Sequence, residues 1–145
     1  MVGDLEADGV GDLVVGSPFQ NNRGAVWILF MDKDGSVDMD QEISHEAGNF
    51  NGNLDRDDAF GSAVAGIGDL DGDGIYDIAV GAPFDDDGGK NRGALWILFL
   101  QANGKVKSHQ KIFDDAGSFS GKLDDDDAFG SAIATLGDLD GDGIT

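Results

Sequence analysis

The feature that most constrains this chain is an internal repeat with a period of about 69 residues. Three stretches align without gaps: residues 22–30 with 91–99, 58–63 with 127–132, and 3–5 with 68–70. The third pair is only 65 residues apart, so one connecting loop is four residues shorter in the first copy. Self-similarity of this period is typical of folds in which one small supersecondary unit is repeated. The chain is therefore expected to consist of repeated structural units.

Each unit predicts four short strands. In the second copy we expect them at residues 60–68, 77–82, 93–100 and 105–113. The first is rich in Gly and Ala, and the apolar run of the third is continuous, which predicts a strand covered on both faces. Asn103-Gly104 joins the last two strands and favours a hairpin with a type I′ turn. Asp34-Gly35 stands at the same place in the first copy.

No segment shows the 3.6-residue periodicity of an amphipathic helix, so the chain is predicted to be all-β. Four antiparallel strands in each repeat favour a β-propeller of four-stranded blades, with about two blades in this chain. A parallel β-helix would have shorter coils, and a β-sandwich does not normally repeat so faithfully. The predicted division is residues 1–57 as strands two to four of a first blade, 58–126 as a complete second blade, and 127–145 as the first strand and truncated acidic loop of a third.

The loop from Asp69 to Asp77 carries the clearest chemical signal. Carboxylates stand at its positions 1, 3, 5 and 9, on Asp69, Asp71, Asp73 and Asp77, and Gly74 allows a tight turn. Ca²⁺ prefers about six to eight oxygen ligands, and alternate residues of a curled loop can direct their oxygens to one centre. The backbone carbonyl of Ile75 is the expected additional ligand. An EF-hand is excluded because position 12 is Val80, not Glu, and strands are predicted on both sides.

Two further loops repeat this pattern in register. The first comprises Asp4, Glu6, Asp8, Val10 and Asp12, with the longer Glu6 at the third position. The third begins with Asp138, Asp140, Asp142 and Ile144 but has no ninth position. Three such loops between predicted strands favour Ca²⁺ over an ion-free acidic turn, and over Mg²⁺, which tolerates irregular carboxylate cages poorly.

Together these motifs resemble the FG-GAP repeat, the blade unit of integrin α-subunit propellers and of many bacterial extracellular proteins. The landmarks are Phe60-Gly61, the Asp69 loop and Gly81-Ala82-Pro83, with Phe129-Gly130 and Gly16-Ser17-Pro18 in the other copies. Ser17 departs from the Ala of the motif. The resemblance covers nearly the whole chain and implies blade-type sheets, one Ca²⁺ between the first two strands of a blade, and a role in extracellular or cell-surface adhesion or protein recognition. Members of this family usually have seven blades.

Composition removes several other classes of function. The net charge is −20, so a nucleic-acid partner is excluded, and divalent cations are the natural counter-charge. There is no cysteine, which excludes disulfides, thiolate zinc sites and a cysteine nucleophile. No apolar run has membrane-spanning length, so no membrane insertion is expected. The N-terminus shows no signal segment, and we interpret the chain as a mature or excised piece.

Acids outside the loops have simpler interpretations. Asp124–Asp127 and the equivalent Asp55, Asp57 and Asp58 are candidates for a second cation site, but solvated connections between blades are favoured. Asp85, Asp86 and Asp87 are expected to be solvated, and His45 and His109 to lie on the surface. We expect no enzymatic activity, because acids explained by cation loops should not be assigned to catalysis as well.

Eight predicted strands make two blades that are out of phase by one strand. The last strand, residues 129–137, is therefore expected to pair with residues 13–16 of a second copy and to build a head-to-tail ring. Three chains would form about six blades and four would form about eight. The alternative is that the chain is part of a longer protein. Other functional alternatives are a carbohydrate-binding or carbohydrate-active propeller, and an engineered or recently amplified repeat without a biological ligand. An extracellular protein or a glycan is the expected further partner.

Overall fold

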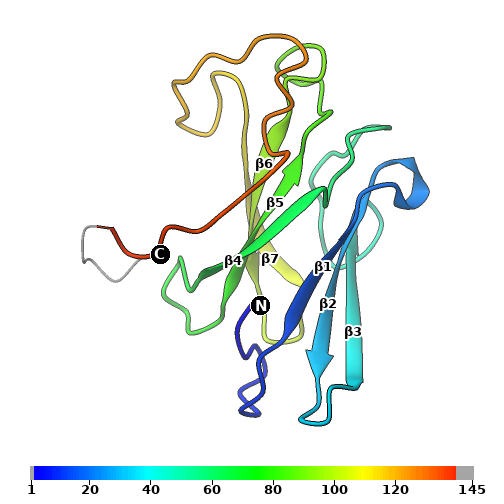
Figure 1. The fold of residues 1–145 in the computed structure, drawn as a ribbon, viewed down its shortest axis with the longest axis vertical. Helices are drawn as coiled ribbons and strands as arrows, with labels where there is room; N and C mark the ends of the chain where they lie inside the picture. The colour runs from blue at the N-terminus through cyan, green and yellow to red at the C-terminus, as the bar shows by residue number, and fades with distance from the viewer. Residues whose placement is uncertain (1, 140–145) are drawn as a thin grey trace.

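The computed structural model describes residues 2–139 and contains two antiparallel sheets joined by residues 45–62 (Figure 1). One sheet has three strands in the order β1-β2-β3, and the other has four in the order β4-β5-β6-β7. The elements are β1 Leu13–Ser17, the 3₁₀ turn η1 Gln20–Asn22, β2 Ala25–Met31, β3 Val37–Ser44, β4 Ala63–Gly68, β5 Asp77–Ala82, β6 Ala94–Leu100 and β7 Val106–Ile112. The all-β prediction is confirmed, and the up-and-down order is that of propeller blades.

Burial along the strands corrects one sequence-based prediction. β5 is buried at all six positions, so it is the strand that is covered on both faces. In β6, fully buried residues alternate with half-buried ones, and the continuous apolar run of this strand therefore reflects one core face and one partly covered face. Both strands are central in the order β4-β5-β6-β7, so the difference lies in what covers the second face and not in the position within the sheet.

The core lies between the two sheets. Phe50 and Phe60, from the segment that links β3 to β4, stack with ring centroids 5.3 Å apart. Trp96 of β6 meets Phe50 edge-on at 5.2 Å. Aromatic pairs of this geometry contribute about 0.5–1.5 kcal/mol each beyond their burial. The linking segment therefore holds the sheets together as well as connecting them.

The backbones of successive units also approach closely at glycines. A Cβ on Gly16 of β1 would lie 1.9 Å from the carbonyl oxygen of Gly61, and a Cβ on Gly81 of β5 would lie 1.9 Å from that of Gly130. Only a residue without a side chain fits at either position. The same contact thus recurs wherever the Phe-Gly landmark crosses the second strand of the preceding unit.

Both hairpins are present where predicted, but their turn type is different. In the β6–β7 turn only Gly104 has a left-handed φ (73°), and its N–H donates to the Gln101 carbonyl at 2.8 Å. In the β2–β3 turn Gly35 has φ 86° and donates to Asp32 at 2.9 Å. A type I′ turn needs two left-handed residues. The observed loops are one residue longer, and a single glycine in the left-handed region completes each one.

The predicted strand at residues 129–137 is not formed. Its one described pairing is the bridge between Phe129 and Gly93, and residues 134–139 are exposed. The equivalent β4 forms because it pairs with β5 along its length. No counterpart of β5 lies beside residues 132–137 within the described part of the chain, so its backbone has no ladder to join. Among residues 2–139 there is also no helix with the length and apolar character needed to cross a bilayer.

The glycine contact between units predicts the effect of a single methyl group. Gly16→Ala should lower the free energy of unfolding by about 1–3 kcal/mol, because the backbones of β1 and residue 61 must separate to admit the new carbon. Thermal unfolding followed by circular dichroism measures this. Gly35→Asn is the control, since nothing lies within 4 Å of its Cβ position and Asn tolerates a left-handed φ. Equal melting temperatures for the two variants would show that the contact is not tight.

Candidate metal centre

The loop between β4 and β5 is curled around the carboxylate of Asp69. One oxygen accepts the N–H groups of Gly72 at 2.8 Å and Asp73 at 3.0 Å, and the other accepts that of Gly74 at 2.8 Å. Gly72 and Gly74 both have left-handed φ angles, 77° and 89°. These glycines let the backbone turn its N–H groups inward. Asp69, at position 1 of the predicted motif, therefore shapes the loop through backbone hydrogen bonds that do not require an ion.

Asp77, at position 9, fastens the other end of the loop to the sheet. It is 1% exposed, and its two oxygens accept the N–H groups of Leu70 at 2.9 Å and Leu100 at 3.0 Å. Burial raises the pKa of Asp77, and the two N–H donors oppose that rise. Since Leu100 belongs to β6, one carboxylate joins the loop, β5 and β6.

The loop brings three of its four predicted acids together. Asp69, Asp71 and Asp77 each present a carboxylate oxygen, and these oxygens lie within 4.8 Å of one another. Oxygens bound to a common Ca²⁺ at about 2.3–2.6 Å can be no farther apart than about 5 Å, so the observed spacing fits such an ion. Asp73 is outside this cluster and pairs with Lys107 of β7. The N–H of Ile75 donates to Asp73 at 2.9 Å.

The first loop repeats this backbone arrangement. Asp4 accepts the N–H groups of Asp8 at 3.1 Å and Gly9 at 2.9 Å, and Val10 donates to Asp8 at 2.7 Å. Asp12 is 1% exposed and accepts N–H groups from Leu5 at 2.8 Å and from Met31 of β2 at 3.2 Å.

The first loop differs from the second in that its carboxylate oxygens do not come together. Asp4, Glu6, Asp8 and Asp12 do not form a comparable oxygen cluster in the described part of the chain. Glu6 is exposed; desolvation, followed by the charges of Asp8, Asp12 and Asp38, raises its pKa. In the third loop Asp138 is described, whereas Asp140, Asp142 and Ile144 lie outside the described residues.

The acids that precede the Phe-Gly landmark contact other protein groups. Asp58 and Asp127 each accept a backbone N–H three residues earlier, at 2.7 Å. Asp126 pairs with Lys90 at 3.0 Å, and Asp125 with Arg92 at 2.9 Å. Within residues 2–139 these acids form no metal-type cluster. Burial raises the pKa of Asp58 to about 6.

The prediction that Asp85 is solvated is wrong. The residue is 2% exposed, and one of its oxygens lies 2.6 Å from the ammonium of Lys111. That ammonium lies over the rings of Trp96 and Phe113, 5.1 and 5.0 Å from their centroids. His109 is half-buried, with its ring 5.3 Å from that of Trp96, so it lies only partly on the surface.

The signal for this pair was present in the repeat. Gln20 and Glu42 occupy the positions of Asp85 and Lys111 in the first copy and bond to each other at 2.9 Å. Two positions that change together between copies indicate a contact.

The repeated sheets and their acidic loops define a segment of a β-propeller. The FG-GAP repeat model matches residues 1–29 and 60–98. Integrin alpha-3 of Cricetulus griseus is 35% identical over 142 residues, which cover 86% of this chain and 12% of that protein. Integrin alpha-5 of Xenopus laevis is 33% identical over 154 residues, which cover 97% of this chain and 13% of that protein. Integrin alpha-6 of Homo sapiens is 39% identical over 106 residues, which cover 70% of this chain and 8% of that protein.

The chain therefore belongs to the FG-GAP repeat family. It spans about a tenth of the length of these curated relatives.

The anchoring role of Asp77 leads to a prediction that does not depend on a metal. Asp77→Asn should lower the free energy of unfolding by about 1–3 kcal/mol in the presence of a chelator, because an amide cannot accept both buried N–H groups through two oxygens. Chemical denaturation in excess EDTA measures this. Asp73→Asn, at a partly exposed position of the same loop, should cost less; an equal loss would contradict the anchoring role of Asp77.

Proposed function

We propose that this chain is a Ca²⁺-binding segment of an FG-GAP propeller that serves extracellular adhesion or protein recognition and does not catalyse a reaction. The oxygen cluster of Asp69, Asp71 and Asp77 is the observation that carries the proposal. Its ligands are hard oxygens from a flexible loop, a set that suits Ca²⁺ better than the strict octahedron of Mg²⁺. The adhesion role rests on the similarity to integrin alpha chains.

The ion has a structural role in this proposal. The loop joins the end of β4 to the start of β5, so an ion held by Asp69 and Asp77 would tie those strands together. An ion that binds only the folded state stabilises it by mass action. It would also offset part of the self-repulsion expected for a net charge of −20. We propose the same role for Asp4, Glu6, Asp8 and Asp12, with the carbonyl of Val10, in the first loop.

We further propose that the blades divide at residues 57/58 and 126/127, and that the free edge of β1 accepts the strand at residues 129–137 of a second copy. Among residues 2–139, β1 pairs with β2 alone, and Leu13 and Val15 are 39% and 43% exposed. The equivalent residues of β5, Ile78 and Val80, are fully buried where that strand also pairs with β4. Residues 132–137 repeat the sequence pattern of β4, so the same register is open to them.

Calcium should raise the melting temperature of the parent chain, and EDTA should reverse that rise. Asp71→Ala should reduce the shift, since Asp71 belongs to the cluster but accepts no backbone N–H in the described contacts. Differential scanning calorimetry at several calcium concentrations measures both effects. Asp40→Ala removes an exposed acid of β3 and serves as the control for charge alone. A parent melting curve that is unchanged by calcium would refute the proposed site.

Self-assembly has a separate test. Size-exclusion chromatography with light scattering should show a closed oligomer of three or four copies, and Thr135→Pro should yield monomers because it removes a backbone donor from the exchanged strand. Thr135→Val preserves the donor and favours a strand, so it should still assemble. A monodisperse monomer of the parent chain would exclude the ring.

A further inference from the structure

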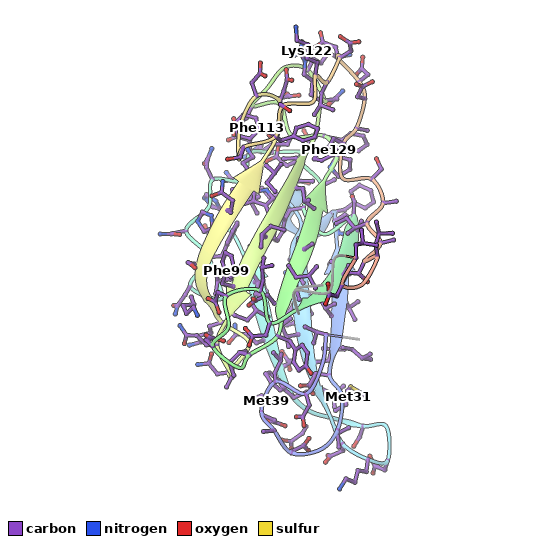
Figure 2. The ribbon with its side chains drawn as sticks, turned by 90° about the vertical axis from the view of Figure 1, so that its left-hand side faces the viewer. Met31, Met39, Phe99, Phe113, Lys122 and Phe129 are labelled. Atoms are coloured by element: carbon purple, nitrogen blue, oxygen red, sulfur yellow. The ribbon has the colours of Figure 1, made fainter. Side chains whose placement is uncertain are left out.

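A β-bulge occurs at the same place in both sheets. Between β2 and β3 the pairing passes from Phe30–Met39 to Met31–Val37 and leaves Asp38 unpaired. Between β6 and β7 it passes from Phe99–Ser108 to Leu100–Val106 and leaves Lys107 unpaired. Figure 2 shows Met31 and Met39, beside the first bulge, at one end of the molecule. A bulge re-aims the side chain of its extra residue, and bulges are frequent next to functional sites.

In the second unit the bulge residue reaches the acidic loop. The ammonium of Lys107 lies 2.6 Å from an oxygen of Asp71 and also pairs with Asp73. Asp71 is one of the three clustered acids, and Asp73 is the predicted ligand that is outside the cluster. The Lys107 side chain therefore supplies a positive charge at the place where a divalent ion would supply it.

In the first unit the bulge residue has the opposite charge. Asp38 is the unpaired residue of the first bulge, at the position that Lys107 occupies in the second, and its charge acts on Glu6 of the first loop. The same position of the fold therefore adds a negative charge to the first loop and a positive charge to the second. Lys107 and Asp38 carry opposite charges at aligned positions of this strand, residues 106–112 and 37–43, as Lys111 and Glu42 also do.

We infer that the bulge residue sets the Ca²⁺ affinity of the adjacent loop. Lys107 is a tethered counter-cation that an incoming Ca²⁺ must displace from Asp71 and Asp73, whereas Asp38 strengthens the attraction of the first loop for the ion. This inference rests on the proposed Ca²⁺ function of the loops. It has two consequences: the two loops bind Ca²⁺ with different affinities, and the second loop is stabilised without the ion.

The decisive experiment compares two lysines of the same segment. Lys107→Gln removes the tethered charge, and Lys105→Gln removes the same charge two residues away, where the described contacts contain no ion pair. Both are made in an Asp8→Ala background, so that binding to the first loop is weakened. Isothermal titration with CaCl₂ measures the dissociation constant, and thermal unfolding in EDTA measures ion-free stability.

Lys107→Gln should bind Ca²⁺ about three- to tenfold more tightly than Lys105→Gln, since two partly exposed ion pairs no longer compete. In EDTA it should melt at a lower temperature than Lys105→Gln, because those pairs also hold the empty loop. Equal dissociation constants and equal EDTA melting temperatures for the two variants would overturn the inference. If the Lys105→Gln protein and its parent bind no Ca²⁺, the proposed function itself fails.

The reciprocal substitution tests the first loop. In an Asp71→Ala background, Asp38→Lys should weaken Ca²⁺ binding to the first loop by about tenfold, since a repelling cation replaces an attracting anion. Asp40→Lys makes the same charge change two residues along β3, within the regular ladder. Equal weakening by both variants would show that only net charge matters and that the bulge position has no special role.

Discussion

A buried carboxylate that accepts two backbone N–H groups is the interaction on which each unit depends. Asp77 connects its own loop to β6, and Asp12 makes the matching connection to β2, so each acidic loop is held against the central strands of its sheet. Charged hydrogen bonds of this type are roughly twice as strong as neutral ones. Because the loop ends are held in this way, the remaining acids can be exposed and still point to one region.

The two units show how one framework tolerates different chemistry. The backbone contacts of Asp4 and Asp69 are nearly the same, yet only the second loop gathers its carboxylates. Away from the loops, the buried pair of Asp85 and Lys111 replaces the hydrogen-bonded pair of Gln20 and Glu42. Backbone hydrogen bonds therefore define the unit, while side-chain pairs vary from copy to copy in a correlated way.

Much of the fold could be predicted from the sequence because the repeat showed each strand twice. The bounds of β5 agree with the prediction, and β4, β6 and β7 differ only at their ends. The strand predicted at residues 129–137 is not formed, because a strand needs a partner and the sequence pattern does not supply one. The turn type was wrong because Asn-Gly is compatible with more than one hairpin loop. For the metal centre, the spacing of acids in the sequence identified Asp69, Asp71 and Asp77. The contact of Lys107 with Asp73 depends on a β-bulge that the local sequence does not predict.

The contact between Gly16 and the carbonyl of Gly61 recurs between Gly81 and Gly130, and it involves only main-chain atoms. A joint of this kind has the same geometry whatever side chains surround it. This backbone contact is therefore repeated whenever the unit is duplicated, while the aromatic packing of Phe50, Phe60 and Trp96 between the sheets is supplied by side chains. Part of the contact between successive units is thus carried by the main chain, which leaves the outer side chains free to diverge.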